Sequence, residues 1–233
     1  MSETTVGKIL EEIWISVNDK GLEERRLTIK KARKTRTLFE LLVATILSQN
    51  TNSRNSSRAF RNLLKRKLIH PKSIIEASMD EIRDSIKVAG LYNRKSIKLK
   101  ELAQIFMEKD IEGELKQLLK EDVNRARGYL LNLPAIGRKT ADIVLLFHYG
   151  KPVMPVDTHI ARISKRLGFV PSKADYEEIR KVLEEALEHD EEKLLTMHLA
   201  LISFGRKICS ARNPKCKMCP VKTYCGHYRK IIS

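Results

Sequence analysis

A lysine and an aspartate, eighteen residues apart, have the side-chain types and the local context for chemistry on a sugar. Lys139 follows Gly137 at the start of an expected helix, where the helix dipole disfavours a cation by roughly a few tenths of a kcal/mol. That field, with partial burial, favours a neutral amine, the form that attacks as a Schiff-base nucleophile. Asp157 begins the next helix, where a carboxylate caps the helix or stabilises positive charge on a sugar. A surface lysine and an ordinary N-cap are the alternatives.

All four cysteines lie within residues 209–225 in the pattern Cys-x6-Cys-x2-Cys-x5-Cys, formed by Cys209, Cys216, Cys219 and Cys225. Four thiolates so close surround one compact centre, whereas two disulfides would be reduced in a cytosolic compartment. A structural zinc usually takes two short knuckles, and only one short spacing is present, so the wider gaps favour a [4Fe–4S] cluster. Zinc remains the alternative, and a redox role for a cluster stays open.

A helix–turn–helix hairpin over residues 131–142 positions Lys139. Pro134 ends the first helix, and Gly137 permits a tight turn with an exposed backbone. The first amides of the second helix lack intrahelical partners, so they can bind a phosphate beside Arg138. A plain turn between two helices is the alternative, and Lys139 is what favours a functional site.

Helical patterning extends over nearly the whole chain, and strand alternation is absent, so we expect an all-α protein. Capping boxes are expected at Thr37–Glu40, Ser73–Glu76 and Ser78–Glu81. Helices are expected over residues 37–47, 95–108, 122–131, 138–149, 158–167, 174–187 and 192–208. Residues 151–155 contain two prolines, which forbid a continuous helix and make this segment the best candidate for a crossing between domains.

The net charge of +16 comes from 45 Lys and Arg against 29 Asp and Glu, and two segments hold the whole surplus. Residues 25–67 contain thirteen Lys and Arg and one acid, and residues 203–233 contain eight and none. Such single-sign blocks favour a polyanionic partner, above all the phosphates of nucleic acid. No run of about 18 apolar residues exists, so we expect no membrane-spanning segment, and the N-terminus does not resemble a secretory signal.

Four motifs together resemble the endonuclease III branch of the helix-hairpin-helix DNA glycosylases. They are Gly-Arg-Lys-Thr-Ala at 137–141, Val-Asp-Thr-His-Ile at 156–160, the cysteine spacing, and Gly-Leu-Tyr-Asn at 90–93 with Lys95. The likeness extends from about residue 35 to Cys225.

The resemblance implies specific roles for the site residues. Lys139 would be the Schiff-base nucleophile and Asp157 the catalytic carboxylate, and the four cysteines would hold a [4Fe–4S] cluster. Gln49 would fill the gap left by the extruded base, and Leu91 would be the opposing wedge. The expected DNA contacts are Gln49, Leu91, Asn93, Lys95, Gly137, Arg138, Arg212, Lys215 and Lys217.

The resemblance also implies two helical domains and a bifunctional enzyme of base excision repair. A helical barrel of residues 30–151 would carry the hairpin, and residues 1–29 with 152–233 would form the cluster domain. A DNA-binding cleft between them would place Lys139 opposite Asp157. The enzyme would remove oxidised pyrimidines from duplex DNA and cleave 3′ to the abasic site by β-elimination. We expect a monomer, in the cytoplasm of a prokaryote and associated with its nucleoid.

The sequence departs from the family pattern between Ser48 and Ala59, where Asn50, Asn52, Asn55 and Arg58 make the base-pocket helix unusually polar. This departure leaves the preferred lesion open. A glycosylase for thymine or uracil opposite guanine is one alternative, although such relatives usually lack a lysine at the hairpin position. A non-catalytic DNA-binding or redox-signalling module is the other.

Overall fold

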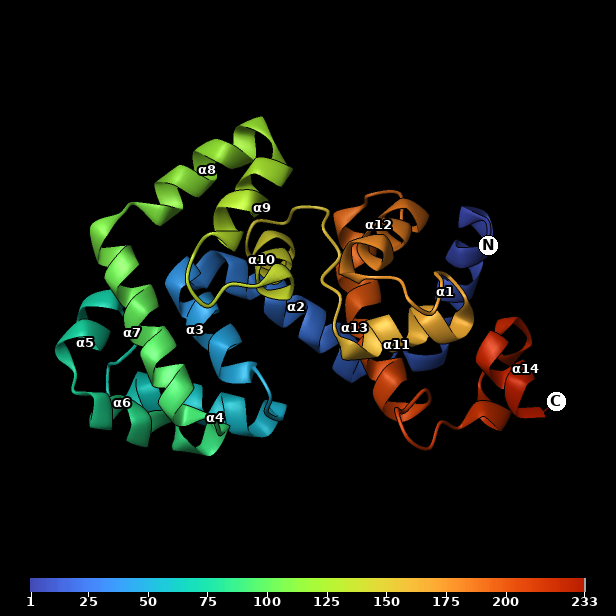
Figure 1. Ribbon diagram of the computed structural model, residues 1–233, viewed down its shortest axis with the longest axis horizontal. Coiled ribbons are helices and arrows are strands. Elements are labelled where there is room, and N and C mark those ends of the chain that lie inside the picture. Colours follow the sequence, from blue (N-terminus) through green and yellow to red (C-terminus); the bar gives the residue numbers. More distant parts are fainter. Residues whose placement is uncertain (233) are drawn as a thin grey trace. The chain divides into compact units, whose positions relative to one another are not determined.

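A computed structural model describes residues 1–232, which form helices joined by short loops and no strand (Figure 1). The all-α class expected from the sequence is confirmed. Between residues 1 and 232, none of the helices combines the length and the apolar character that crossing a bilayer requires.

The chain divides into two compact units. Unit 1 consists of Met1–Lys34 and the chain from Leu145 onward, and unit 2 consists of Thr35–Val144. The sequence predicts boundaries at residues 30 and 151. The contacts within the units divide the chain after Lys34 and after Val144. The proline segment 151–155 therefore lies within unit 1.

Unit 2 carries the hairpin. Its helices are α3 (Leu38–Ser48), α4 (Ser53–Lys65), α5 (Pro71–Glu76), α6 (Met79–Ile86), the short η1 (Lys87–Ala89), α7 (Tyr92–Glu108), α8 (Ile111–Glu121), α9 (Val123–Leu131) and α10 (Arg138–Ile143).

Unit 1 carries the cysteines and both described ends of the chain. Its elements are α1 (Glu3–Val17), α2 (Lys20–Thr35, reaching one residue into unit 2), the π-helix η2 (Val144–His148, whose first residue closes unit 2), α11 (Thr158–Leu167), α12 (Tyr176–Ala186), α13 (Glu191–Lys207), η3 (Cys216–Met218), η4 (Lys222–Tyr224) and α14 (Gly226–Ile232).

Local capping explains where several unit 2 helices begin. Thr37 and Ser78 form the expected capping boxes with Glu40 and Glu81, so both of these predictions are confirmed. The expected box starting at Ser73 is wrong, because α5 already begins at Pro71. Proline suits the first helical position, since its missing N–H would have no partner there. The Ser73 hydroxyl does not cap a helix start at Ser73 but accepts from the backbone N–H of His70.

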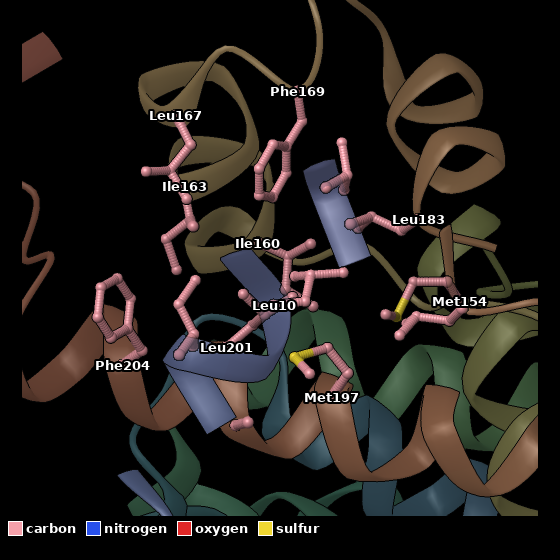
Figure 2. Close-up of a cluster of buried hydrophobic side chains, with 14 of the residues drawn as sticks. Leu10, Met154, Ile160, Ile163, Leu167, Phe169, Leu183, Met197, Leu201 and Phe204 are labelled. Carbon is pink, nitrogen blue, oxygen red and sulfur yellow. The ribbon is translucent and has the colours of Figure 1, made fainter. Parts of the chain in front are cut away.

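The core of unit 1 joins segments from both parts of the chain (Figure 2). Leu10 of α1, Ile160 of α11 and Leu201 of α13 are fully buried and lie together. Burial of a side chain of this size is worth roughly 1.5–3 kcal/mol. The N-terminal helix is therefore an integral part of this unit, and α11, whose N-cap is Asp157, packs against the same core.

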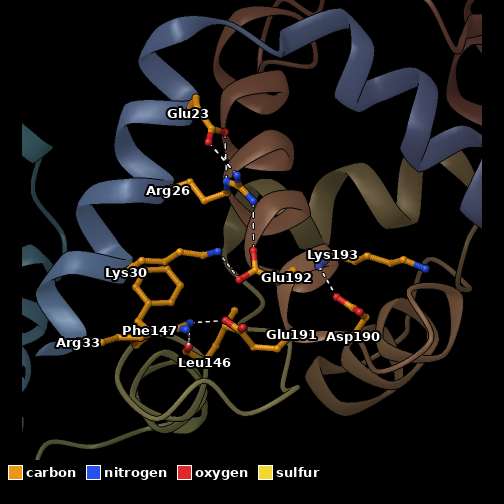
Figure 3. Close-up of polar contacts among 10 residues, drawn as sticks. All are labelled: Glu23, Arg26, Lys30, Arg33, Leu146, Phe147, Asp190, Glu191, Glu192 and Lys193. Carbon is orange, nitrogen blue, oxygen red and sulfur yellow. Dashed lines mark hydrogen bonds and ion pairs between the residues drawn. The ribbon is translucent and has the colours of Figure 1, made fainter.

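Three basic residues of α2 pair with acids of α13, as Figure 3 shows. Arg26 and Lys30 both pair with Glu192, and Arg33 pairs with Glu191. Arg33 also donates to the carbonyl oxygens of Leu146 and Phe147 in η2, at 2.7 and 2.9 Å. Part of the N-terminal basic block is thus neutralised within unit 1.

Candidate functional site

Lys139 lies in the first turn of α10, directly after the turn of the hairpin. Its side chain is exposed, as are the neighbouring Arg138 and Gly137. The expectation of partial burial is therefore wrong for Lys139. Lys139 lies at the start of a helix, as the sequence predicts, and its amine is accessible to solvent.

The turn achieves its shape differently from the sequence-based expectation. Ala135 takes the left-handed conformation, with φ of 64°, while Gly137 is extended, with φ of −96° and ψ of 177°. Gly137 is therefore not needed for a positive φ. A Cβ atom built on it would meet no protein atom within 4 Å, so its lack of a side chain keeps the backbone beside Lys139 open.

A buried ion pair fixes the two helices of the hairpin to each other. The Arg127 guanidinium on α9 donates to both carboxylate oxygens of Asp142 on α10, at 2.5 and 3.2 Å. Asp142 is fully buried. A bidentate pair restricts both position and rotation, so Arg127 sets the orientation of the helix that presents Lys139. The sequence interpretation missed this pair, although an acid three residues after Lys139 on a core-facing helix was its available signal.

Asp157 is the N-cap of α11, so its structural role is established. Its Oδ1 accepts from the backbone N–H groups of His159 and Ile160, at 2.8 and 2.9 Å. Both hydrogen bonds use the same oxygen, and within residues 1–232 no hydrogen bond to Oδ2 is formed. The half-buried carboxylate can cap the helix and still offer its second oxygen to a ligand.

The segment before Asp157 is held by three contacts from the rest of unit 1. The N–H of Met154 donates to Glu184, the N–H of Val156 donates to the Tyr176 hydroxyl, and Nδ1 of His198 lies 3.0 Å from the Pro155 carbonyl oxygen. Hydrogen bonds therefore fix the segment that precedes Asp157, and α11 fixes the chain that follows it.

Gln49 and Leu91 lie on two loops of unit 2 that a single lysine ties together. Lys95 is 2% exposed, and its Nζ donates to the carbonyl oxygens of Leu47 and Ala89, both at 2.9 Å. Burial, with a smaller contribution from Lys98, lowers the pKa of Lys95. The expectation of a direct DNA contact is therefore wrong for Lys95, because its ammonium faces inward and is occupied by carbonyl groups.

The side chains on these two loops have the exposure that a recognition surface needs. Leu91 is 49% exposed and holds a left-handed backbone with φ of 49°, and Asn93 is exposed beside it. Gln49 is half-buried, and its Oε1 lies 3.4 Å from Nζ of Lys98, a contact that the sequence did not suggest. Asn52, one of the unexpected polar residues, is the N-cap of α4.

The four cysteines are free thiols and together line one pocket of unit 1, with Arg166. Arg166 donates to Sγ of Cys209, and the thiol of Cys225 donates to the Arg166 carbonyl oxygen, both at 3.4 Å. Burial and the neighbouring thiols raise the pKa of Cys216, and burial raises the pKa of Cys219 to about 11. Partly buried thiols that share one pocket suit a metal centre, which would displace their protons, and Arg166 would offset the negative charge of the resulting thiolates.

The fit to one bare metal ion is poorer. Across the part of the chain that the structure describes, no three Cys, His, Asp or Glu side chains are grouped closely enough to bind a single ion. The thiols surround a pocket rather than a point. On the same loop Arg212, Lys215 and Lys217 are exposed.

Comparisons with known proteins identify the family to which the chain is related. Residues 43–189 match the family described as HhH-GPD superfamily base excision DNA repair protein. Endonuclease III of Sulfolobus acidocaldarius is 37% identical over 196 residues, covering 84% of each chain. Endonuclease III of Thermotoga maritima is 35% identical over 192 residues, covering 82% of this chain and 84% of its own.

Solved structures show the same fold. A trapped covalent intermediate of endonuclease III with DNA has a TM-score of 0.71 and 29% identity, covering 91% of this chain and 99% of that one. A thermostable thymine-DNA glycosylase also has a TM-score of 0.71, at 24% identity, covering 98% and 97%. The second likeness concerns the fold alone.

Proposed function

The chain belongs to the endonuclease III family of the HhH-GPD superfamily of base excision DNA repair proteins, and we propose that its substrates are oxidised pyrimidines in duplex DNA. It is an enzyme of the DNA glycosylase/AP lyase class. We further propose that Lys139 forms the Schiff base and that strand cleavage follows by β-elimination. The exposed amine of Lys139, on a helix held by the buried Arg127–Asp142 pair, is the observation that carries the proposal.

In the proposed reaction the Lys139 amine acts first as the nucleophile and then, as an iminium, withdraws electrons from the sugar. Its lone pair attacks the anomeric carbon, the N-glycosidic bond breaks, and the base departs with the bonding electrons and takes up a proton. The Lys139 nitrogen then loses a proton, the C1′–O4′ bond breaks, O4′ takes up a proton, and an iminium remains between Lys139 and the former anomeric carbon. The iminium acidifies the adjacent 2′ hydrogens, and loss of one proton expels the 3′ phosphate. Water then hydrolyses the Schiff base and regenerates the amine.

Asp157 would stabilise the positive charge that develops on the sugar as the base leaves. A fixed carboxylate is effective in this role because it needs no reorganisation during the reaction. Its Oδ1 is held by the amides of α11, and its Oδ2 is the oxygen that we assign to the sugar.

The DNA would be bound mainly through its backbone. Extrusion of a damaged base costs less than the few kcal/mol needed for a sound one, because the damaged base is less well stacked. We assign Gln49 and Leu91 to the gap that the base leaves. Phosphate contacts are assigned to Asn93, Gly137, Arg138, Arg212, Lys215 and Lys217, all of which are exposed.

We propose that Cys209, Cys216, Cys219 and Cys225 hold a [4Fe–4S] cluster. The group would supply a rigid covalent scaffold for the loop 209–225 and is assigned no step of the reaction. The shared pocket and the adjacent Arg166 support this assignment, since a cation suits a cluster that carries net negative charge with its four thiolates.

A panel of single-lesion duplexes tests the substrate assignment. It contains an oxidised pyrimidine, thymine opposite guanine, uracil opposite guanine, and a bare abasic site. We expect release of the oxidised base and cleavage at both that site and the abasic site. Release of thymine or uracil without cleavage would overturn the assignment in favour of a mismatch glycosylase.

A further inference from the structure

The N-terminal basic block divides into a neutralised part and an uncompensated part. On α2, Arg26, Lys30 and Arg33 are paired with the acids of α13. On α4 the cations are exposed, and the helix itself contains no acid. In the described part of the chain none of the α4 cations forms an ion pair. They are Arg54, Arg58, Arg61 and Lys65.

These four residues form one stripe, which we call the α4 ridge. They are separated by four, three and four positions, and side chains at such intervals lie on one face of a helix. From Arg54 to Lys65 the ridge rises about 16 Å, at 1.5 Å per residue. That length is close to the axial rise of about five base pairs, at 3.4 Å each.

A pocket beside the ridge adds groups that suit a phosphate. It is lined by Arg36, Ser57, Phe60 and Arg61, among others. The Arg36 guanidinium lies over the Phe60 ring, 5.2 Å from its centroid, which holds this cation against α4 while its N–H groups remain available. Guanidinium and hydroxyl groups are the usual side-chain donors to phosphate oxygens.

The ridge begins beside the loop that carries Gln49. Asn52 closes that loop as the N-cap of α4, and Arg54 is two residues further on. Both features belong to unit 2, so the ridge extends along α4 away from the position that we assign to the gap left by the extruded base.

We propose that the α4 ridge binds the sugar-phosphate backbone of the duplex arm on one side of the lesion. The inference rests on the proposed function for the position of Gln49, and the ridge would bind DNA in addition to the residues assigned above. Duplex DNA is favoured over an acidic protein segment because the ridge is a straight row of cations whose apolar neighbours are few, namely the exposed Leu64 and the half-buried Phe60. A protein interface would require an apolar centre.

Neutralisation of the ridge tests the proposal. In the variant R54Q/R58Q/R61Q/K65Q, helix propensity is nearly unchanged, because Gln and Arg are similar helix formers. We expect binding to an undamaged duplex to weaken about tenfold or more at low salt. The slope of log K against log salt should fall by about 0.9 for each phosphate that the variant no longer neutralises.

A charge-matched control separates the ridge from the total charge. The variant K8Q/K109Q/K120Q/K173Q also removes four exposed positive charges, and none of these lysines has an ion-pair partner in residues 1–232. We expect its salt slope to stay close to that of the wild type. Equal slopes for wild type and ridge variant would overturn the proposal. The milder variant R61Q/K65Q supplies the same comparison if the fourfold change unfolds the protein.

Shortening one arm of a lesion duplex tests the direction of the interaction. Wild type should lose affinity when the arm on one side is cut from about 12 to about 4 base pairs, and the ridge variant should be insensitive to that cut. Identical sensitivity in both proteins would contradict the proposal. Both tests measure binding, so their outcome does not depend on catalysis. Failure of the wild-type protein to form a covalent adduct with an abasic site would count against the proposed function and not against the α4 ridge.

Discussion

Arg127 and Asp142 form a bidentate ion pair inside the hairpin, with the Arg127 Nε 2.5 Å from Asp142 Oδ1. The carboxylate is fully buried and the guanidinium is nearly so. Lys139 lies three residues before Asp142, on the same short helix. The pair therefore links the stability of the hairpin to the orientation of the amine.

Replacing Arg127 with Met should destabilise the protein by about 3 kcal/mol, because a buried carboxylate loses its guanidinium partner. Urea unfolding measures the change. Arg125→Gln is a matched control on the same helix, since Arg125 pairs with Glu121 in an exposed position and should cost less than about 1 kcal/mol. Similar losses in the two variants would contradict this role for the buried pair.

Lys95→Met should loosen the loops that carry Gln49 and Leu91. Two buried carbonyl groups lose their donor, and we expect a cost of about 1–3 kcal/mol at neutral pH. Affinity for a lesion duplex should fall more than affinity for an undamaged one, because loop positions matter most where a base is extruded. Equal losses on both duplexes would argue against a positioning role.

The same lysine predicts a pH dependence of stability. The pKa of Lys95 is lowered from its ordinary value of 10.5 by burial and by Lys98, so the unfolded chain holds this proton more firmly. The contribution is fully present above pH 10.5 and is lost as the pH falls through the folded-state pKa. Wild type should therefore gain stability relative to Lys95→Met as the pH rises toward 10.5. A pH-independent difference would contradict the burial of a charged amine.

Asp157→Asn separates the helix cap from the charge. Asparagine caps as well as aspartate does, so the free energy of unfolding should change by less than about 0.5 kcal/mol. Base release should slow by about a hundredfold or more, with a smaller effect on cleavage of a preformed abasic site. Asp190→Asn, at the start of α13, is the matched control and should leave both rates unchanged. Unchanged base release in Asp157→Asn would remove the carboxylate from the mechanism.

Metal content tests the cysteine assignment. Purified protein should be brown, through thiolate-to-iron charge transfer, with about four iron atoms per chain. Cys219→Ser should lose both the colour and part of the affinity for duplex DNA, because Lys215 and Lys217 lie on the same loop. Colourless protein containing one zinc ion per chain would show that the zinc alternative was correct.

The sequence predicted most of the fold because the helix signals are local. Asp122 and Asp157 are N-caps of helices, as predicted from their residue type. The capping boxes at Thr37 and Ser78 form as predicted. These features depend on residues three or four positions apart, and such short-range preferences survive whatever the tertiary packing is.

Long-range contacts explain what the sequence did not predict. The helix expected to continue to residue 149 changes to a π-helix at Val144, where Arg33 binds the carbonyl groups of Leu146 and Phe147. The sequence predicts a DNA contact for Lys95 because nothing nearby in the sequence shows that its ammonium is enclosed. Likewise, the basic block could not be divided without knowing that Glu191 and Glu192 lie beside α2.

Borohydride trapping on abasic-site DNA tests the central claim, that Lys139 is the nucleophile. Reduction converts the iminium into a stable amine, so each productive encounter leaves protein covalently bound to DNA. Wild type and Arg138→Gln should both give the adduct, since a guanidinium is not a nucleophile and Lys139 is unchanged in this variant. Lys139→Gln should give none while still binding the duplex within about tenfold. An adduct that persists in Lys139→Gln would contradict the account.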